Sequence, residues 1–396
     1  MGVLRIIFLI LFIVGVWGSC VSREQRKSEQ EGIKELRFFP EGYDNINGFR
    51  LQYPIGIRHV MVETSGGAYK FLHDPAIIAH HDRLIAAWYN CPEGEIVEES
   101  SIRARRSVDG GLTWSEPEVI AEDKGKNGIF YVPAQLFSNK GNLFAFVGKM
   151  TAHDRIVNTT LYKYDEQGSS WIEKGEVAPL FLPNCAPVQL SNGSWLISGR
   201  VASSLGNLPL IPAVMISDVD DVEGTWRIVK LSETEYRQDQ YPETTVMVEG
   251  ENLVAFVRSD GVQNQPDVYW STDNGNSWEA VKRHDFSAIS AKFYAGRLQD
   301  GRGYIVYNHL PEGKDKAYTF DDRQILAISV SENPASPLHF SRTYKVQSAG
   351  TGTPALSHYP SVLEHNGNLY IIYTASFKGE TKRQCQLAII PLASLE

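Results

Sequence analysis

The chain has 396 residues, of which 42% are hydrophobic and 11% aromatic, and it contains 33 glycines and 19 prolines. This length exceeds the usual size of a single core, but the composition suits an all-β repeat array that stays one domain. The formal net charge of −9 argues against a nucleic-acid-binding surface, because such a surface needs a basic stripe that this sequence lacks.

The N-terminal residues 1–20 have the pattern of an export signal. Arg5 is followed by an apolar run from Ile6 to Trp17 that is too short to span a bilayer, and small residues precede Cys20. The segment resembles a bacterial lipoprotein signal, which predicts lipidation of Cys20; an ordinary secretory signal is the alternative. Residues 21–35 are predicted to be a flexible tether, and residues 36–396 a single domain. We expect export to a bacterial cell envelope, outer-membrane or periplasmic, with membrane contact through the lipid anchor only.

The stretch from Phe71 to Trp114 defines a repeating unit. Two apolar runs flank the polar turn at residues 80–83, and a third run leads into a turn with Asp109 and two glycines. Four antiparallel strands in this space are typical of one propeller blade. His80 and His81, in the first turn, are expected to be solvated.

Prolines mark later copies of this unit. Pro75, Pro133, Pro187, Pro242 and Pro360 are separated by 58, 54, 55 and 118 residues, and a copy without proline near Tyr294 fills the double gap. Such units bury their faces only in a closed ring. The sequence therefore predicts a six-bladed β-propeller of four-stranded antiparallel blades, in which residues 57–64 complete the last blade. Residues 36–56 leave a seventh blade possible.

Metal and cofactor chemistry find no support in the sequence. Beyond Cys20 there are three cysteines, Cys91, Cys185 and Cys385, at spacings that fit neither a disulfide framework nor a metal site. We expect them to be buried small hydrophobes. Zinc-protease, Walker and dinucleotide-binding motifs are absent from the sequence, so we predict no metal and no cofactor.

Two segments, Ser107–Trp114 and Ser271–Trp278, fit the pattern S-x-D-x-G-x-x-W. This pattern resembles the Asp box of the sialidase superfamily, and the resemblance covers residues 56–390. The Asp carboxylate is expected to accept backbone N–H bonds in its own turn while the Trp packs between sheets, so the boxes are predicted to be structural. The resemblance implies a six-bladed propeller with carbohydrate chemistry in its central funnel.

The funnel is where the first residues of the innermost strands converge. By the resemblance, Tyr359 stands in the place of the sialidase nucleophile and Glu243 in that of its partner. Arg258 and Arg297, with Arg200, are expected to bind a carboxylate. Further substrate-binding residues are predicted on the same ring: Arg58, Tyr131, Asn184, Lys292 and Tyr294.

The first blade departs from the sialidase pattern, because His73 stands where sialidases have an arginine. Here the segments around His59 and His73 are more similar to histidine-dependent enzymes that cut rhamnose–glucuronate linkages, and to ulvan lyases. A neutral imidazole can exchange a proton near pH 7 while an arginine pairs with the uronate. We therefore predict a secreted enzyme that cleaves a terminal linkage in an anionic oligo- or polysaccharide, by hydrolysis or elimination, with His73 or His59 as its catalytic histidine. An exo-α-sialidase using Tyr359 and Glu243, and a non-catalytic glycan-binding propeller, are the alternatives.

Overall fold

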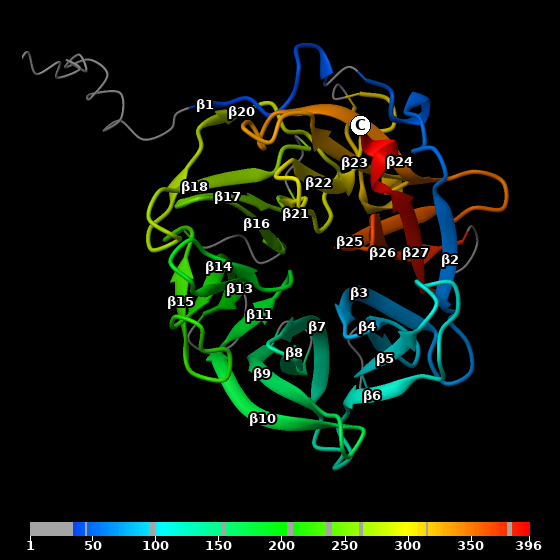
Figure 1. The fold of residues 1–396 in the computed structure, drawn as a ribbon, viewed down its shortest axis with the longest axis vertical. Helices are drawn as coiled ribbons and strands as arrows, with labels where there is room; N and C mark the ends of the chain where they lie inside the picture. The colour runs from blue at the N-terminus through cyan, green and yellow to red at the C-terminus, as the bar shows by residue number, and fades with distance from the viewer. Residues whose placement is uncertain are drawn as a thin grey trace, which may run out of the picture.

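The computed structural model describes residues 35–43, 46–95, 100–152, 155–203, 209–234, 240–260, 264–313, 316–377 and 382–396. The predicted signal at residues 1–20, with Cys20, lies outside this range, as does the tether except for Glu35. Within it, six blades surround a central axis (Figure 1). No helix of the described part is long and apolar enough to cross a membrane.

Each blade is an antiparallel sheet that runs from the axis outward. Blade 1 contains β3 (Phe71–His80), β4 (Arg83–Cys91), β5 (Ser101–Ser107) and β6 (Glu118–Ala121). Blade 2 contains β7 (Phe130–Asn139), β8 (Asn142–Ala152), β9 (Arg155–Asp165) and β10 (Ser170–Pro179). Blade 3 contains β11 (Phe181–Pro183), β12 (Val188–Gln189), β13 (Trp195–Ala202), β14 (Leu210–Ser217) and β15 (Trp226–Lys230).

The second half of the ring repeats this arrangement. Blade 4 contains β16 (Thr244–Glu249), β17 (Asn252–Val257), β18 (Asp267–Ser271) and β19 (Glu279–Ala280). Blade 5 contains β21 (Tyr294–Arg297), β22 (Gly303–Asn308), β23 (Ile325–Ser331) and β24 (Phe340–Ser348). Blade 6 contains β25 (Leu356–His365), β26 (Asn368–Ser376), β27 (Gln384–Pro391) and β2 (Arg58–Glu63). In blade 3 the innermost strand is divided into β11 and β12, which both pair with β13. With these two counted as one strand, the prediction of six four-stranded blades is confirmed.

The ring closes as predicted, because the N-terminal strand β2 pairs antiparallel with β27 of the C-terminal blade. Figure 1 shows β2 as the outer edge of that blade. Residues 36–56 do not add a seventh blade. Instead β1 (Glu35–Leu36) pairs with β20 (Arg283–His284), and Phe38 and Phe39 are buried in the aromatic cluster of blades 4 and 5.

Tight turns join the strands nearest the axis. In blade 2 the connection between β7 and β8 is Lys140–Gly141, and both residues have positive φ, 49° and 73°. Two consecutive positive φ angles are the mark of the type I′ turn, whose twist matches that of the flanking strands. The apolar faces of adjacent sheets then pack together, and Cys91, Cys185 and Cys385 are free and buried between them, as predicted.

The two Asp boxes occupy equivalent loops between the third and fourth strands of blades 1 and 4. Asp109 accepts hydrogen bonds from the Thr113 amide at 2.9 Å and the Thr113 hydroxyl at 2.6 Å. Asp273 accepts the same two bonds from Ser277, at 2.9 and 2.6 Å. These bonds lower the pKa of Asp109 to about 2, and the predicted structural role of the boxes is confirmed.

A bulge near the start of the innermost strand turns a side chain toward the axis. The register of β3 with β4 shifts between His73 and Ala76, and that of β25 with β26 shifts between His358 and Ser361. Within these bulges Asp74 has φ 46° and Tyr359 has φ 57°, values that non-glycine residues rarely adopt. Bulges of this kind commonly re-aim side chains at functional sites. Here they direct two polar residues into the centre of the ring.

Candidate functional site

A cavity of about 200 Å³ lies in the centre of the ring and is lined from several blades. Four arginines line it, from blades 3 to 6: Arg200, Arg258, Arg323 and Arg383. Apolar side chains from blades 2 and 3 form an apolar wall: Val132, Met150, Ile156, Leu182 and Leu210. We call this cavity the central pocket. Its lining suits a ligand with an anionic group and an apolar face.

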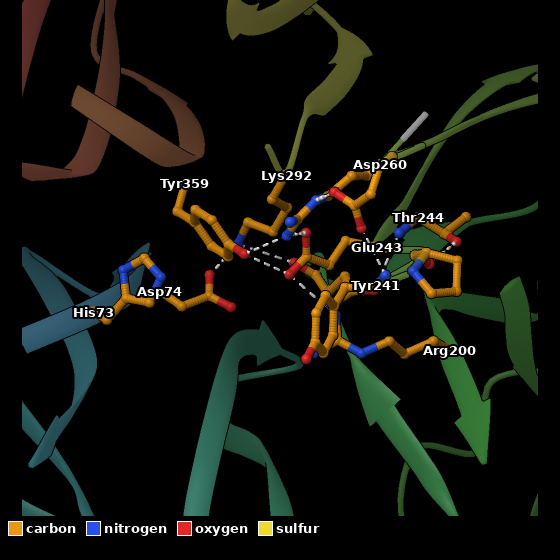
Figure 2. A network of polar contacts seen from close by, with 12 residues as sticks. His73, Asp74, Arg200, Tyr241, Glu243, Thr244, Asp260, Lys292 and Tyr359 are labelled. Carbon is orange, nitrogen blue, oxygen red and sulfur yellow. Dashed lines mark hydrogen bonds and ion pairs between the residues drawn. The ribbon is translucent and has the colours of Figure 1, made fainter. Parts of the chain in front are cut away.

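Tyr359, Glu243 and Arg258 form the hydrogen-bonded centre of the pocket (Figure 2). The Tyr359 hydroxyl donates to Glu243 Oε1 at 2.6 Å. Arg258 Nη1 donates to the same hydroxyl oxygen and to Glu243 Oε2, each at 2.9 Å. The three groups come from blades 6 and 4 and are all buried. A hydroxyl next to a carboxylate that can take its proton is the arrangement of an activated nucleophile.

The protonation states of this centre follow from its charges. Burial alone would raise the pKa of Glu243, but Arg258 and Arg200 outweigh burial, and the pKa is lowered to about 2. Burial and the charge of Glu243 raise the pKa of Tyr359 above its ordinary value. At neutral pH the pair is therefore a carboxylate and a neutral phenol, with the proton on Tyr359.

Neighbouring groups hold the arginines in place. Arg258 Nε donates to Asp260 Oδ1 at 2.8 Å and to the Ser290 hydroxyl at 2.9 Å. Arg323 donates through Nε and Nη2 to the Ser290 carbonyl, at 2.9 and 2.6 Å. Burial and the charge of Arg258 lower the pKa of Arg323 to about 10, so it stays protonated at neutral pH. Arg200 Nη1 lies 3.2 Å from Glu243 Oε1.

Asp74 and Lys292 form a buried ion pair that contributes one carboxylate to the pocket lining. Lys292 is fully buried and also donates to the Asn184 carbonyl at 3.2 Å. Burial raises the pKa of Asp74, and Lys292 opposes this effect. The pair links the bulge of blade 1 to blade 5 across the axis (Figure 2).

His73 lines the pocket but has a neighbour at each ring nitrogen. Nδ1 lies 2.8 Å from the Thr374 hydroxyl, and Nε2 lies 3.4 Å from Arg383 Nη1. Because a guanidinium only donates, Nε2 is the acceptor and Nδ1 carries the proton in the neutral ring. Burial, together with the positive charge of Arg383, lowers the pKa of His73 well below its ordinary value. The histidine thus orients Arg383 at the edge of the pocket.

An acidic residue and an aromatic ring complete the rim. Glu95 follows β4 of blade 1, is exposed, and accepts a hydrogen bond from the Tyr89 hydroxyl at 3.0 Å. Phe320 is 52% exposed, and the guanidinium groups of Arg258 and Arg323 lie 5.4 and 4.8 Å from its ring centre. Glu95 can serve as a proton donor at the mouth of the pocket, and Phe320 can stack on a sugar ring.

The structure brings together five of the site residues predicted from sequence: His73, Arg200, Glu243, Arg258 and Tyr359. It places four others next to the axis but outside the pocket lining: Tyr131, Asn184, Lys292 and Tyr294.

The remaining three lie away from the pocket. Arg58 and His59 are on β2, the outermost strand of blade 6, where His59 Nδ1 lies 3.2 Å from the Tyr373 hydroxyl. Arg297 ends β21, and its guanidinium donates to the Gly301 and Pro334 carbonyls. Arg58 and His59 are far from the axis because β2 is the outermost strand of its blade. Arg297 is at the end of β21 that points away from the central pocket.

Four charged lining residues were not predicted from the sequence: Asp74, Glu95, Arg323 and Arg383. Asp74 could have been found from the sequence. When His73-Asp74-Pro75 is aligned with His358-Tyr359-Pro360, Asp74 has the position equivalent to that of Tyr359. The other three stand in loops next to strands and belong to no repeated motif. His80 was also misjudged: it is 4% exposed and therefore not a solvated turn residue.

The chain was compared with known proteins. The BNR repeat-like domain matches residues 82–371. Among curated proteins no sequence matches this chain. A Dyadobacter fermentans protein of unknown function superposes with a TM-score of 0.63 at 18% identity, covering 85% of this chain and 99% of its own.

Sialidase structures show the same fold at low sequence identity. Trypanosoma rangeli sialidase in complex with sialic acid has a TM-score of 0.61 at 15% identity, covering 86% of this chain, which spans only 60% of that protein's length. The Hadza microbial sialidase Hz136 has a TM-score of 0.62 at 13% identity, covering 83% of this chain and 67% of its own. The finer likeness to rhamnose–glucuronate enzymes stays a prediction. The family match and the shared architecture establish that this chain belongs to the BNR repeat-like domain family and has a sialidase-like propeller fold.

Proposed function

We propose that this protein is a retaining glycosidase that removes a terminal carboxylate-bearing sugar, with Tyr359 as its nucleophile. The observation that carries the proposal is the 2.6 Å hydrogen bond from the Tyr359 hydroxyl to the ionised Glu243. A neutral phenol is a weak nucleophile until a base takes its proton. Tyrosine nucleophiles are a known variant of the two-carboxylate arrangement of glycosidases.

The proposed reaction has two displacements. First, Tyr359 Oη bonds to the anomeric carbon and passes its proton to Glu243, while the glycosidic bond breaks and Glu95 protonates the departing oxygen. Second, Glu95 takes a proton from water, the water oxygen attacks the anomeric carbon, and the bond to Tyr359 breaks as Glu243 returns the proton. Two inversions retain the anomeric configuration, and every group ends in its starting state.

The charges of the pocket favour an anionic substrate. Glu243 and Asp260 balance Arg200 and Arg258. Arg323 and Arg383 remain, and neither forms an ion pair with a carboxylate among the described residues. Two guanidinium groups beside one cavity suit a carboxylate, which they can bind through charge-assisted hydrogen bonds. The apolar wall from blades 2 and 3 then faces the less polar side of the sugar.

The second candidate function is the histidine-dependent cleavage of a rhamnose–glucuronate linkage. Its supporting observation is that the His73 ring lies in the pocket lining, 4.2 Å from the Tyr359 ring. We place it second because both ring nitrogens of His73 already face Thr374 and Arg383, which leaves no nitrogen for a substrate proton. A non-catalytic glycan-binding propeller is the third candidate.

One experiment separates the three. The purified protein is incubated with methylumbelliferyl α-sialoside, a rhamnosyl-glucuronide and an uncharged methylumbelliferyl β-galactoside. The proposal expects turnover of the sialoside, none of the galactoside, and a covalent sugar adduct on Tyr359 by mass spectrometry when the 2,3-difluorinated analogue of sialic acid is used. Cleavage of the rhamnosyl-glucuronide, seen as released rhamnose or as ultraviolet absorbance of an unsaturated uronate, would support the second candidate. Binding without turnover would support the third.

We also propose that the enzyme is exported and held in a bacterial cell envelope through a lipid on Cys20. The support is the order of charge, apolar run and small residues within residues 1–20. Palmitate labelling in a bacterial host should tag the wild-type protein and not Cys20→Ser. Equal labelling of both would contradict the anchor.

A further inference from the structure

A second group of polar side chains lies at the other end of blade 1. Strand β3 passes the pocket at His73 and ends seven positions later at His80, a distance of about 23 Å along a strand. His81 follows with φ 53° in the turn to β4. Glu166 comes from the turn between β9 and β10 of blade 2. The cluster therefore joins two blades on the face remote from the central pocket.

The three side chains converge on one point. His80 Nε2 lies 3.2 Å from Glu166 Oε1, and the rings of His80 and His81 are 4.1 Å apart at their centres. One nitrogen or oxygen from each residue lies within 4.8 Å of the other two. Donor atoms around a tetrahedral zinc ion are about 3.3 Å apart. His81 and Glu166 are exposed, so their side chains are free to close this gap by rotation.

The position of His80 suits a metal ligand. It is 4% exposed, so the protein holds its ring in place beside Glu166. Neutral imidazole is the form that binds metals. His80 Nδ1 lies 2.8 Å from the Ser138 hydroxyl, which can accept a hydrogen bond from Nδ1–H and so leave the Nε2 lone pair for an ion.

The charges around the cluster permit a cation. Arg106 is a positive charge near His80. It is neutralised by Glu118, whose Oε1 lies 2.9 Å from Arg106 Nη2. Glu166 then supplies one carboxylate beside two imidazoles, and a set of two histidines and one glutamate is known in zinc sites.

Blade 6 provides an internal comparison. His365 ends β25 as His80 ends β3, and the next residue, Asn366, has φ 47°, close to that of His81. The backbone is thus alike at both turns. Of these two turns, and among the residues that the structure describes, the turn of blade 1 alone adds a second histidine and a carboxylate from the neighbouring blade, so His365 is a matched control.

We propose that His80, His81 and Glu166 bind a divalent transition-metal ion, with zinc as the preferred ion and water as the fourth ligand. Two imidazole nitrogens and one carboxylate oxygen suit zinc, whereas magnesium and calcium prefer oxygen ligands. The ion would connect the β3–β4 turn to the β9–β10 turn and thereby fasten blade 1 to blade 2. The site needs nothing from the central pocket, so it stands or fails independently of the proposed function.

The test uses the full chain without a polyhistidine tag, stripped with a chelator and titrated with zinc chloride by calorimetry. We expect one zinc per chain and, at zinc 100-fold above its dissociation constant, an unfolding temperature raised by about 3 °C or more. Magnesium chloride should bind at least about 100-fold more weakly. Cobalt(II) should give the visible absorption of a four-coordinate ion.

Variants locate the ion. His81→Ala and Glu166→Gln change exposed side chains and should each weaken zinc binding at least about tenfold. His365→Ala, in the matched turn of blade 6, should leave it unchanged. The proposal is overturned if the wild-type protein binds no zinc, if both cluster variants bind it as the wild type does, or if His365→Ala weakens it equally.

Discussion

Blades 1 and 6 carry the same backbone feature with different side chains. Both have a histidine, a bulge residue with positive φ, and a proline: His73-Asp74-Pro75 in blade 1 and His358-Tyr359-Pro360 in blade 6. Both bulge residues point to the axis, yet Asp74 pairs with the buried Lys292 whereas Tyr359 pairs with Glu243 and Arg258. The bulge therefore directs a side chain to the axis, and its partners from a blade two positions away around the ring determine what that side chain can do.

The difference between the two positions lies in the charge they meet. Lys292 is fully buried, so Asp74 chiefly compensates a cation that would otherwise be unpaired in the core. Tyr359 meets an ionised carboxylate that two arginines hold in its charged form. We infer that position 74 contributes mainly to stability and position 359 mainly to chemistry. Separate substitutions at the two positions, with activity and stability measured for each, test this inference.

The largest expected effect is that of Tyr359→Phe. Loss of the hydroxyl removes the proposed nucleophile, so kcat should fall at least about 10⁴-fold, as it does when the nucleophile of a group of cooperating catalytic residues is removed. The free energy of unfolding should fall by only about 1–3 kcal/mol, because two hydrogen bonds are lost, one to Glu243 and one from Arg258. Steady-state kinetics and urea unfolding measure the two quantities. Tyr373→Phe is the control and should keep its activity, because Tyr373 is buried, lies outside the pocket lining and donates its hydroxyl hydrogen to Gln386. Activity within tenfold of wild type in Tyr359→Phe would end the nucleophile assignment.

The next effect is that of Asp74→Asn, chosen because asparagine tolerates the positive φ at this position. The variant leaves Lys292 buried without a counter-charge, which should lower the free energy of unfolding by about 3–5 kcal/mol. Urea unfolding of Asp74→Asn/Lys292→Met should show at least half of this stability restored, since no charge then remains buried. If Asp74→Asn alone is as stable as the wild type, the ion pair of Asp74 and Lys292 does not stabilise the fold.

The features that the sequence could predict are those marked by residues that recur at a regular spacing. The prolines and the two Asp boxes recur with the period of the blades, so they predict six blades, the closing strand and the positions of Tyr359 and Glu243. Arg383 could not be found in this way. It contacts His73 across 310 residues of sequence and stands in a loop that no repeat predicts. Contacts between loops of different blades depend on ring closure, which a one-dimensional period does not describe.

A similar reason explains the misplaced arginine. The sequence around Arg297 resembles a strand entrance, but the strand there is only Tyr294–Arg297, so the residue lies at the far end of β21. Its guanidinium is satisfied by backbone carbonyls in the adjoining turns. The cation that blade 5 does contribute to the pocket is Arg323, just before β23. Arg297 and Arg323 are both arginines, and it is the direction of the neighbouring strand that decides which of them reaches the pocket.

The smallest predicted effect tests the histidines that the two blades share. Burial, together with the charges of nearby arginines, lowers the pKa of both His73 and His358 well below the ordinary value of 6.5. Groups whose folded pKa is lowered give stability that is present above pH 6.5 and is lost as pH falls, because the unfolded chain then binds protons that the folded chain does not.

The measurement is the free energy of unfolding in urea at pH 7.5, 6.5 and 5.5 for the wild type and for His358→Met. Each such histidine should contribute a loss of about 1.4 kcal/mol per pH unit below its unfolded pKa. His358→Met lacks one of these groups, so its stability relative to the wild type should rise by about 1 kcal/mol between pH 6.5 and 5.5. His365→Met, at the partly exposed other end of β25, is the control for the substitution itself. Parallel curves for His358→Met and the wild type would mean that His358 takes up its proton in the folded protein, where Arg258, Arg323 and Arg383 should prevent it.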